Sequence, residues 1–128
     1  MKPFLLVALL LLAPAAAAAG VDWSKARPVS VVTTEYRFSP NRLSFRRGAA
    51  YRLHIENHGT ELHEFTAPEF FKAVQMRDPG VLNADRTEIA IPPGKTKDFL
   101  FVPQRQGRFP LRCADHDWAG MTGEITVK

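Results

Sequence analysis

Apolar and polar residues alternate at every second position along much of the chain, which is the pattern of β-strands with one buried face. The clearest case is residues 51–56, where Tyr51, Leu53 and Ile55 alternate with charged or polar residues. Turn residues such as those at 39–41 and 92–94 separate the alternating segments. The pattern predicts seven or eight short strands, within residues 29–34, 42–46, 51–56, 62–66, 87–91, 96–102, 108–113 and 123–127. We therefore expect an all-β fold built as a β-sandwich.

Residues 67–86 break this pattern. Their apolar residues do not alternate, and Pro68, Pro79 and Asn83 interrupt the segment. Proline is favoured in the first turn of a helix, so residues 69–76 are predicted to form a short helix after Pro68. We expect one short helical or irregular insert in the sandwich.

Residues 1–19 have the organisation of a secretory signal peptide. Lys2 supplies the positive charge, residues 4–12 are continuously apolar, and small residues at 15–19 suit cleavage after Ala19. The apolar stretch is short for a membrane span, although the alanines that follow leave an uncleaved anchor as an alternative. We therefore expect a domain of residues 20–128 in the periplasm or outside the cell, with no stable membrane insertion after cleavage.

The charge pattern argues against a nucleic-acid partner. Without Lys2, 16 basic residues face 13 acidic ones, a net charge of +3, and the arginines are scattered with no basic stripe. The chain has one cysteine, so an internal disulfide is excluded. In an exported protein, that cysteine is an inert buried thiol, half of an intermolecular bridge, or a residue with a special role such as metal binding.

The surroundings of this cysteine favour a metal. Cys113, His116 and Met121 form a Cys-x2-His-x4-Met run, so a thiolate, an imidazole and a thioether lie within nine residues. A short loop can wrap these ligands around one ion. The set suits copper, and a second histidine would complete a trigonal His2Cys site with a weak axial methionine.

Three histidines remain for the fourth ligand. His54 lies on the polar side of its strand, and His58 lies in the turn beside Gly59, where it stays a possible ligand. His63 opens the next strand, where an imidazole can be held rigidly, so it is the preferred candidate. Glu64 is expected to point to the opposite face of that strand and is not predicted as a ligand, although it could contact the ligands or lie on the surface.

These residues resemble the cupredoxin family, and plastocyanin and pseudoazurin in particular. The spacing of Cys113, His116 and Met121 matches the family's ligand loop, and residues 38–48 look like its opening hairpin. Asn57, a short loop and then His63 resemble the segment that carries its first histidine ligand. The resemblance implies a Greek-key β-sandwich that holds one copper ion at one end.

The predicted function is that of an electron carrier that cycles between Cu(I) and Cu(II), with a redox protein as partner, and we expect a monomer. The alternative is a copper-homeostasis protein of the cell envelope that sequesters copper or exchanges it with a donor or acceptor protein. Asp115 and Asp117 beside His116 favour this alternative slightly. An enzyme is not expected, because copper catalysis needs an open coordination position and four protein ligands leave none.

Overall fold

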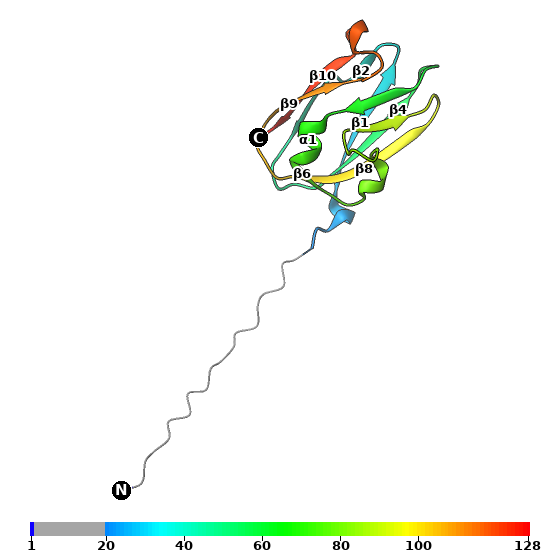
Figure 1. The fold of residues 1–128 in the computed structure, drawn as a ribbon. Helices are drawn as coiled ribbons and strands as arrows, with labels where there is room; N and C mark the ends of the chain where they lie inside the picture. The colour runs from blue at the N-terminus through cyan, green and yellow to red at the C-terminus, as the bar shows by residue number, and fades with distance from the viewer. Residues whose placement is uncertain (2–19) are drawn as a thin grey trace.

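Two five-stranded β-sheets form a sandwich in the computed structural model, which describes Met1 and residues 20–128 (Figure 1). The first sheet has the order β2-β1-β4-β8-β6, and its strands are β1 (Arg27–Thr34), β2 (Arg37–Ser39), β4 (Tyr51–Asn57), β6 (Val74–Met76) and β8 (Thr96–Pro103). The second has the order β3-β10-β9-β5-β7, and its strands are β3 (Arg42–Phe45), β5 (His63–Thr66), β7 (Glu88–Ile91), β9 (Gly107–Arg112) and β10 (Thr122–Val127). The predicted all-β, Greek-key class of fold is confirmed.

Four short helical segments join these strands in the described part of the chain: η1 (Trp23–Lys25), α1 (Pro68–Lys72), η2 (Pro79–Val81) and η3 (Asp117–Ala119). No helix among the described residues is long and apolar enough to cross a membrane. The predicted signal peptide lies, apart from Met1, outside those residues, so its cleavage stays a prediction.

Two details of the sequence-based prediction were wrong. The described residues contain ten strands and not seven or eight, and the prediction missed β2 and β6. Each has only three residues, which is too short for an alternating pattern to appear. The helix is also shorter than the predicted 69–76, since α1 ends at Lys72 and Val74–Met76 pairs instead with β8. Pairing with β8 satisfies the backbone groups of this segment as well as a longer helix would.

Aromatic rings fill the space between the sheets. Phe99 and Phe101 alternate inward from β8 and are stacked with their ring centroids 5.2 Å apart. Phe45 and Phe70 approach Phe101 edge-on at 5.0 and 5.3 Å. Such ring pairs add to the free energy gained by burying apolar area, and they make a rigid base for the loops at the ends of the sandwich.

Strand pairing brings the two predicted ligand segments together. Thr66 of β5 pairs antiparallel with Arg112, the last residue of β9. The beginning of β5, at His63, therefore extends past the end of β9 and lies beside the loop that starts at Cys113. This loop lies at the end of the sandwich opposite η1, as the orange and blue ends of the ribbon show (Figure 1).

Candidate metal centre

The ligand loop, residues 113–121, is closed by its own backbone. The amide of Cys113 donates to the carbonyl of Met121 at 3.0 Å, where β9 gives way to the loop and the loop to β10. The amide of His116 donates to the carbonyl of Cys113 at 3.2 Å, which turns the chain back over the cysteine. Gly120 has φ +82°, a value that side chains disfavour, and it directs the chain into β10. The loop thus fixes Cys113, His116 and Met121 relative to one another.

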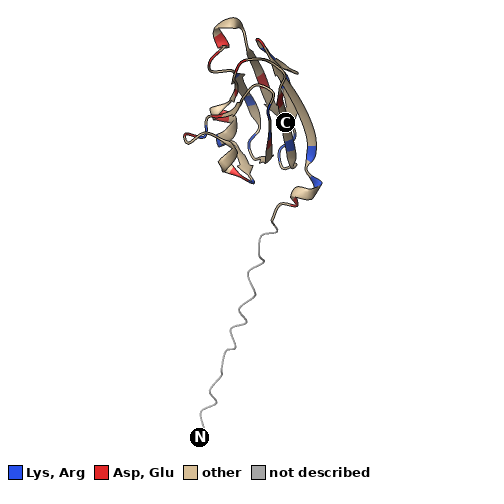
Figure 2. Ribbon diagram, turned by 90° about the vertical axis from the view of Figure 1, so that its right-hand side faces the viewer, with Lys and Arg blue, Asp and Glu red and all other residues tan. Residues whose placement is uncertain are grey.

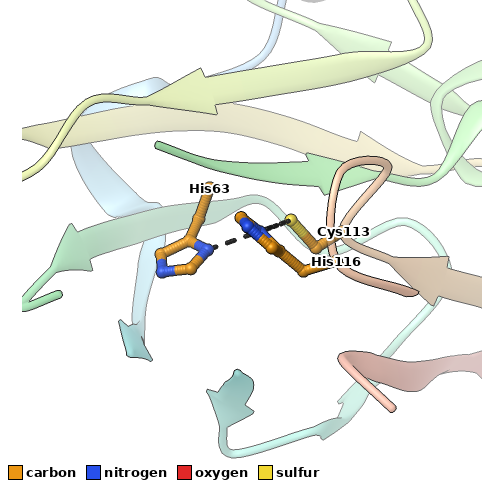
Figure 3. Close-up of side chains that lie close together, drawn as sticks. All are labelled: His63, Cys113 and His116. Atoms are coloured by element: carbon orange, nitrogen blue, oxygen red, sulfur yellow. Dashed lines mark hydrogen bonds between the residues drawn. The ribbon is translucent and has the colours of Figure 1, made fainter. Parts of the chain in front are cut away.

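Three donor atoms converge between this loop and β5. The sulfur of Cys113 lies 3.5 Å from Nδ1 of His116 and 3.9 Å from Nδ1 of His63 (Figure 3). All three donor atoms lie within 4.8 Å of one another. Bonds of about 2.0 Å to nitrogen and 2.3 Å to sulfur, 120° apart, put N and S about 3.7 Å from each other. The observed spacing therefore fits one metal ion bound in the plane of the three donors.

Met121 is buried beside the donor group, whereas His58 and His54 lie outside that group. Met121 is fully buried at the end of the ligand loop, where its carbonyl accepts from the amide of Cys113. His58 is not a member of the donor group, because its Nε2 contacts the Glu56 carboxylate and its side chain is 57% exposed. His54 contacts Asp98 on the outer face of the first sheet. Geometry therefore favours His63 over His58 as the upstream donor.

His63 is held by the loop that precedes it, residues 58–62. The buried side chain of Asn57 donates to the carbonyls of Glu61 and Ile91, both at 2.8 Å. The Glu35 carboxylate accepts from the amides of Thr60 and Glu61 at 2.7 and 2.9 Å. These contacts fix the chain immediately before His63.

Gly59 allows the Glu35 carboxylate to lie directly against this loop. A Cβ atom at residue 59 would displace that carboxylate, which accepts from the amides of Thr60 and Glu61.

Glu64 is closer to the site than the sequence indicated. We expected it to point away from His63, yet its Oε2 accepts from the Cys113 thiol at 3.0 Å and its amide donates to the same sulfur at 3.4 Å. His63 and Glu64 can both approach the sulfur because Cys113 lies in the loop beside β5 and not in a paired strand. Glu64 is outside the group of donor atoms that lie within 4.8 Å of one another, so it contacts the sulfur without joining the metal plane.

Burial disfavours the charged forms of these groups when no metal is bound. It raises the pKa of the Cys113 thiol to about 11. Burial also raises the pKa of Glu64 and lowers the pKa of His63, so the carboxylic acid and the neutral imidazole are favoured. A metal ion would have to displace the thiol proton, and it would meet His63 already in the form that binds metals.

Carboxylates lie behind both imidazoles. Oε2 of Glu61 is 3.1 Å from Nε2 of His116, and Oε1 of Glu35 is 3.4 Å from Nε2 of His63. Neither contact has the geometry of a hydrogen bond, so the effect of both carboxylates is electrostatic. A carboxylate behind a metal-binding histidine orients the ring and makes it a stronger ligand. The sequence contains no spacing that connects Glu35 or Glu61 with the ligands, and neither was predicted.

The ring of Tyr36 also packs against His116. The Tyr36 ring lies 4.8 Å from the imidazole and 5.9 Å from Trp118, which is 76% exposed. The His116 side chain, in contact with Tyr36 and Glu61, is 13% exposed. Acidic ribbon segments are visible at this end of the sandwich (Figure 2).

Comparison with known proteins agrees with this geometry. The chain belongs to the family described as cupredoxin-like domain, which matches residues 3–127. It is 32% identical over 116 residues to the copper-resistant cuproprotein CopI of Rubrivivax gelatinosus, and the alignment covers 84% of this chain and 70% of CopI. The family resemblance seen in the sequence is confirmed.

Solved structures share the fold at low sequence identity. Auracyanin B superimposes with a TM-score of 0.60 and 19% identity over 84% of this chain and 93% of its own. Auracyanin from Roseiflexus castenholzii gives 0.61 and 18% over 80% and 98%. The Cu(I)-bound metal binding domain of the Cu(I) exporting P-type ATPase CopA from Streptococcus pneumoniae D39 gives 0.53 and 15% over 87% and 92%.

Proposed function

We propose that this protein binds one copper ion through Nδ1 of His63, the thiolate of Cys113 and Nδ1 of His116, with Met121 as a weak axial ligand. The spacing of the three donors supports this assignment, as does their chemistry, because one thiolate, two imidazoles and a thioether suit copper better than zinc. Copper bound in such a site can cycle between Cu(I) and Cu(II). The backbone amide of Glu64 stabilises the thiolate by donating to its sulfur.

The role we propose is copper homeostasis in the cell envelope, in which the protein holds copper and passes it on. The observation that carries this role is the carboxylate of Glu61 against the outer nitrogen of His116. A redox partner would have to dock over this charge and remove it from water, which is costly unless the partner pairs with it. The similarity to a copper-resistant cuproprotein supports the same role.

Electron transfer is the second candidate, and the spacing of the donors favours it. The sulfur and the two Nδ1 atoms have the separations of a trigonal site. A site whose donors are held by a short hydrogen-bonded loop and a strand needs little rearrangement when copper changes its oxidation state, and this makes electron transfer fast. It would require a redox partner that accommodates Glu61 and Tyr36.

The remaining features of the proposal follow from the sequence. We infer that the protein is exported by its N-terminal segment to the periplasm or the exterior and acts as a monomer. Its partner in this role is a copper donor or acceptor protein of the cell envelope. We assign it no catalytic activity, since the four proposed ligands would fill the coordination positions of the copper.

Growth of a deletion strain in rising copper concentrations tests the role. We expect the deletion to reduce copper tolerance, wild-type protein to restore it, and the Cys113→Ser variant to fail. Unchanged tolerance together with slower electron flow through envelope cytochromes would instead assign the protein to electron transfer.

A further inference from the structure

A group of histidine and carboxylate side chains lies on the outer face of the first sheet, apart from the cysteine centre. Asp98 Oδ1 is 2.9 Å from Nδ1 of His54, whose Nε2 is 3.0 Å from Oε1 of Glu56. The other oxygen of Glu56, Oε2, is 2.7 Å from Nε2 of His58. The four side chains thus form a continuous chain of contacts in which one carboxylate bridges two imidazoles.

The position of this group in the sheet is fixed. His54 and Glu56 lie on β4, the central strand of the first sheet, and His54 is directly opposite Asp98 of β8. The residues opposite them on the two neighbouring strands include no cation and are Ser30, Val32, Thr96 and Asp98. The carboxylate of Glu56 is therefore balanced by the two histidines and not by a lysine or arginine opposite it.

Hydrogen bonds connect these four side chains when no metal is bound. Each contact between an imidazole nitrogen and a carboxylate oxygen needs a hydrogen, and His54 makes such contacts with both of its nitrogens. Its pKa is raised, first by Asp98 and then by Glu56, in keeping with a charged ring. A metal ion could replace the protons that lie between Glu56 and the two rings, because it neutralises the same carboxylate and binds both nitrogens.

We propose that His54, Glu56 and His58 form a second metal site, which takes a divalent transition-metal ion and prefers Cu(II). Two imidazoles and a carboxylate are donors for Cu(II), Ni(II) and Zn(II), and Cu(II) binds most tightly in this series. Asp98 is a positioning residue, because it accepts the Nδ1 hydrogen of His54 and leaves Nε2 free for the metal. This site goes beyond the proposed function and shares no residue with the cysteine centre.

Closure of the second site requires side-chain rotation. Its donors are not all within 4.8 Å of one another, because the imidazoles contact different oxygens of Glu56. His58 lies beyond the end of β4 and its side chain is 57% exposed, so it can turn toward an ion held by His54 and Glu56. Waters would complete the coordination, which makes this an exposed site with nitrogen and oxygen ligands only.

Titration of the purified protein with Cu(II), followed by EPR and visible absorption, tests the proposal. We expect two bound ions: one with the thiolate absorption band, and a second with the large hyperfine splitting of nitrogen and oxygen ligation and no such band. The double variant His54→Gln/His58→Gln should lose the second ion and keep the thiolate band, which also shows that it is folded. Asp98→Asn should lower the affinity for the second ion by about 10- to 100-fold.

Arg52→Gln, on the same exposed face of β4, is the matched control and should bind both ions. The proposal is overturned if wild-type protein shows no Cu(II) signal of nitrogen and oxygen ligation, or if the double variant keeps that signal with unchanged affinity. The variant His63→Ala/Cys113→Ser/His116→Ala separates this result from the proposed function, because it lacks the three donors of the cysteine centre. The nitrogen and oxygen signal should persist in it whether or not the first assignment is right.

Discussion

The carboxylate of Glu61 lies 3.1 Å from Nε2 of His116, on the side of the ring that faces away from the Cys113 sulfur. This pairing links the loop before His63 to the loop that carries His116. It places a negative charge behind a ligand, where it strengthens the bond from the imidazole to the more highly charged Cu(II) ion.

Glu61→Gln should therefore raise the reduction potential of the copper centre. Each tenfold loss of Cu(II) affinity relative to Cu(I) corresponds to about 60 mV for one electron, and loss of such a partner costs about 10- to 100-fold in affinity. Voltammetry of the copper-loaded variant measures the shift. Glu69→Gln, at an exposed residue of α1, is the control and should leave the potential unchanged. A potential that does not move in Glu61→Gln would show that the pairing has no effect on the metal.

Met121→Leu should also raise the potential, for a different reason. The substitution keeps the buried volume approximately and removes the sulfur, so Cu(II) loses a weak donor while three ligands still bind the ion. We expect copper to stay bound, with a changed visible spectrum and a higher potential. Met76→Leu is the control, at a partly buried methionine of β6. If Met121→Leu changes neither quantity, Met121 only packs in the core.

The choice between the two upstream histidines is open to a direct comparison. His63→Ala should abolish the thiolate absorption band or weaken copper binding strongly, because it removes a donor from the metal plane. His58→Ala should leave that band unchanged, since His58 contacts Glu56 and lies outside the donor group. Copper stoichiometry and EPR of both variants are the measurements. The reverse pattern would assign His58 as the ligand.

The stability of the copper-free protein should depend on the Cys113 thiol at high pH. Burial raises its pKa from an ordinary 9.0 to about 11, so the unfolded chain loses this proton first and its free energy falls. The contribution of the thiol is present below pH 9 and is lost as pH rises through 11. Two pKa units correspond to about 3 kcal/mol.

Denaturant unfolding of wild type and Cys113→Ser between about pH 8 and pH 11 measures this contribution. Serine does not titrate in this range, so the difference between the two proteins isolates the thiol. We expect the wild type to lose stability relative to Cys113→Ser as the pH rises. A constant difference would mean that the thiol has an ordinary pKa.

Local sequence patterns predicted the parts of the centre that depend on one segment. The spacing of Cys113, His116 and Met121 is a property of a single loop, and backbone hydrogen bonds within that loop fix its shape. His63 could be preferred over His58 because the alternation of apolar and polar residues places His63 at the beginning of a strand. The eight strands with alternating or continuous apolar residues were recognised for the same reason.

Contacts between distant segments could not be predicted in this way. Glu35 reaches His63 because the turn after β1 packs under residues 58–62, and no pattern in the sequence records that packing. Glu64 approaches the sulfur because Cys113 lies just beyond the end of a strand, where strict alternation of faces no longer holds. The three-residue strand β6 forms by pairing with β8 and has no periodicity of its own.

The visible spectrum of the Cu(II)-loaded protein tests the copper assignment most directly, with wild type and Cys113→Ser measured side by side. We predict an intense thiolate-to-copper band in the wild type, because the sulfur lies 3.5 and 3.9 Å from the two imidazole nitrogens that would share the ion. The band should be absent in Cys113→Ser, which keeps the loop but replaces the sulfur with oxygen. A wild-type spectrum without this band, or a Cys113→Ser spectrum that retains it, would contradict the assignment.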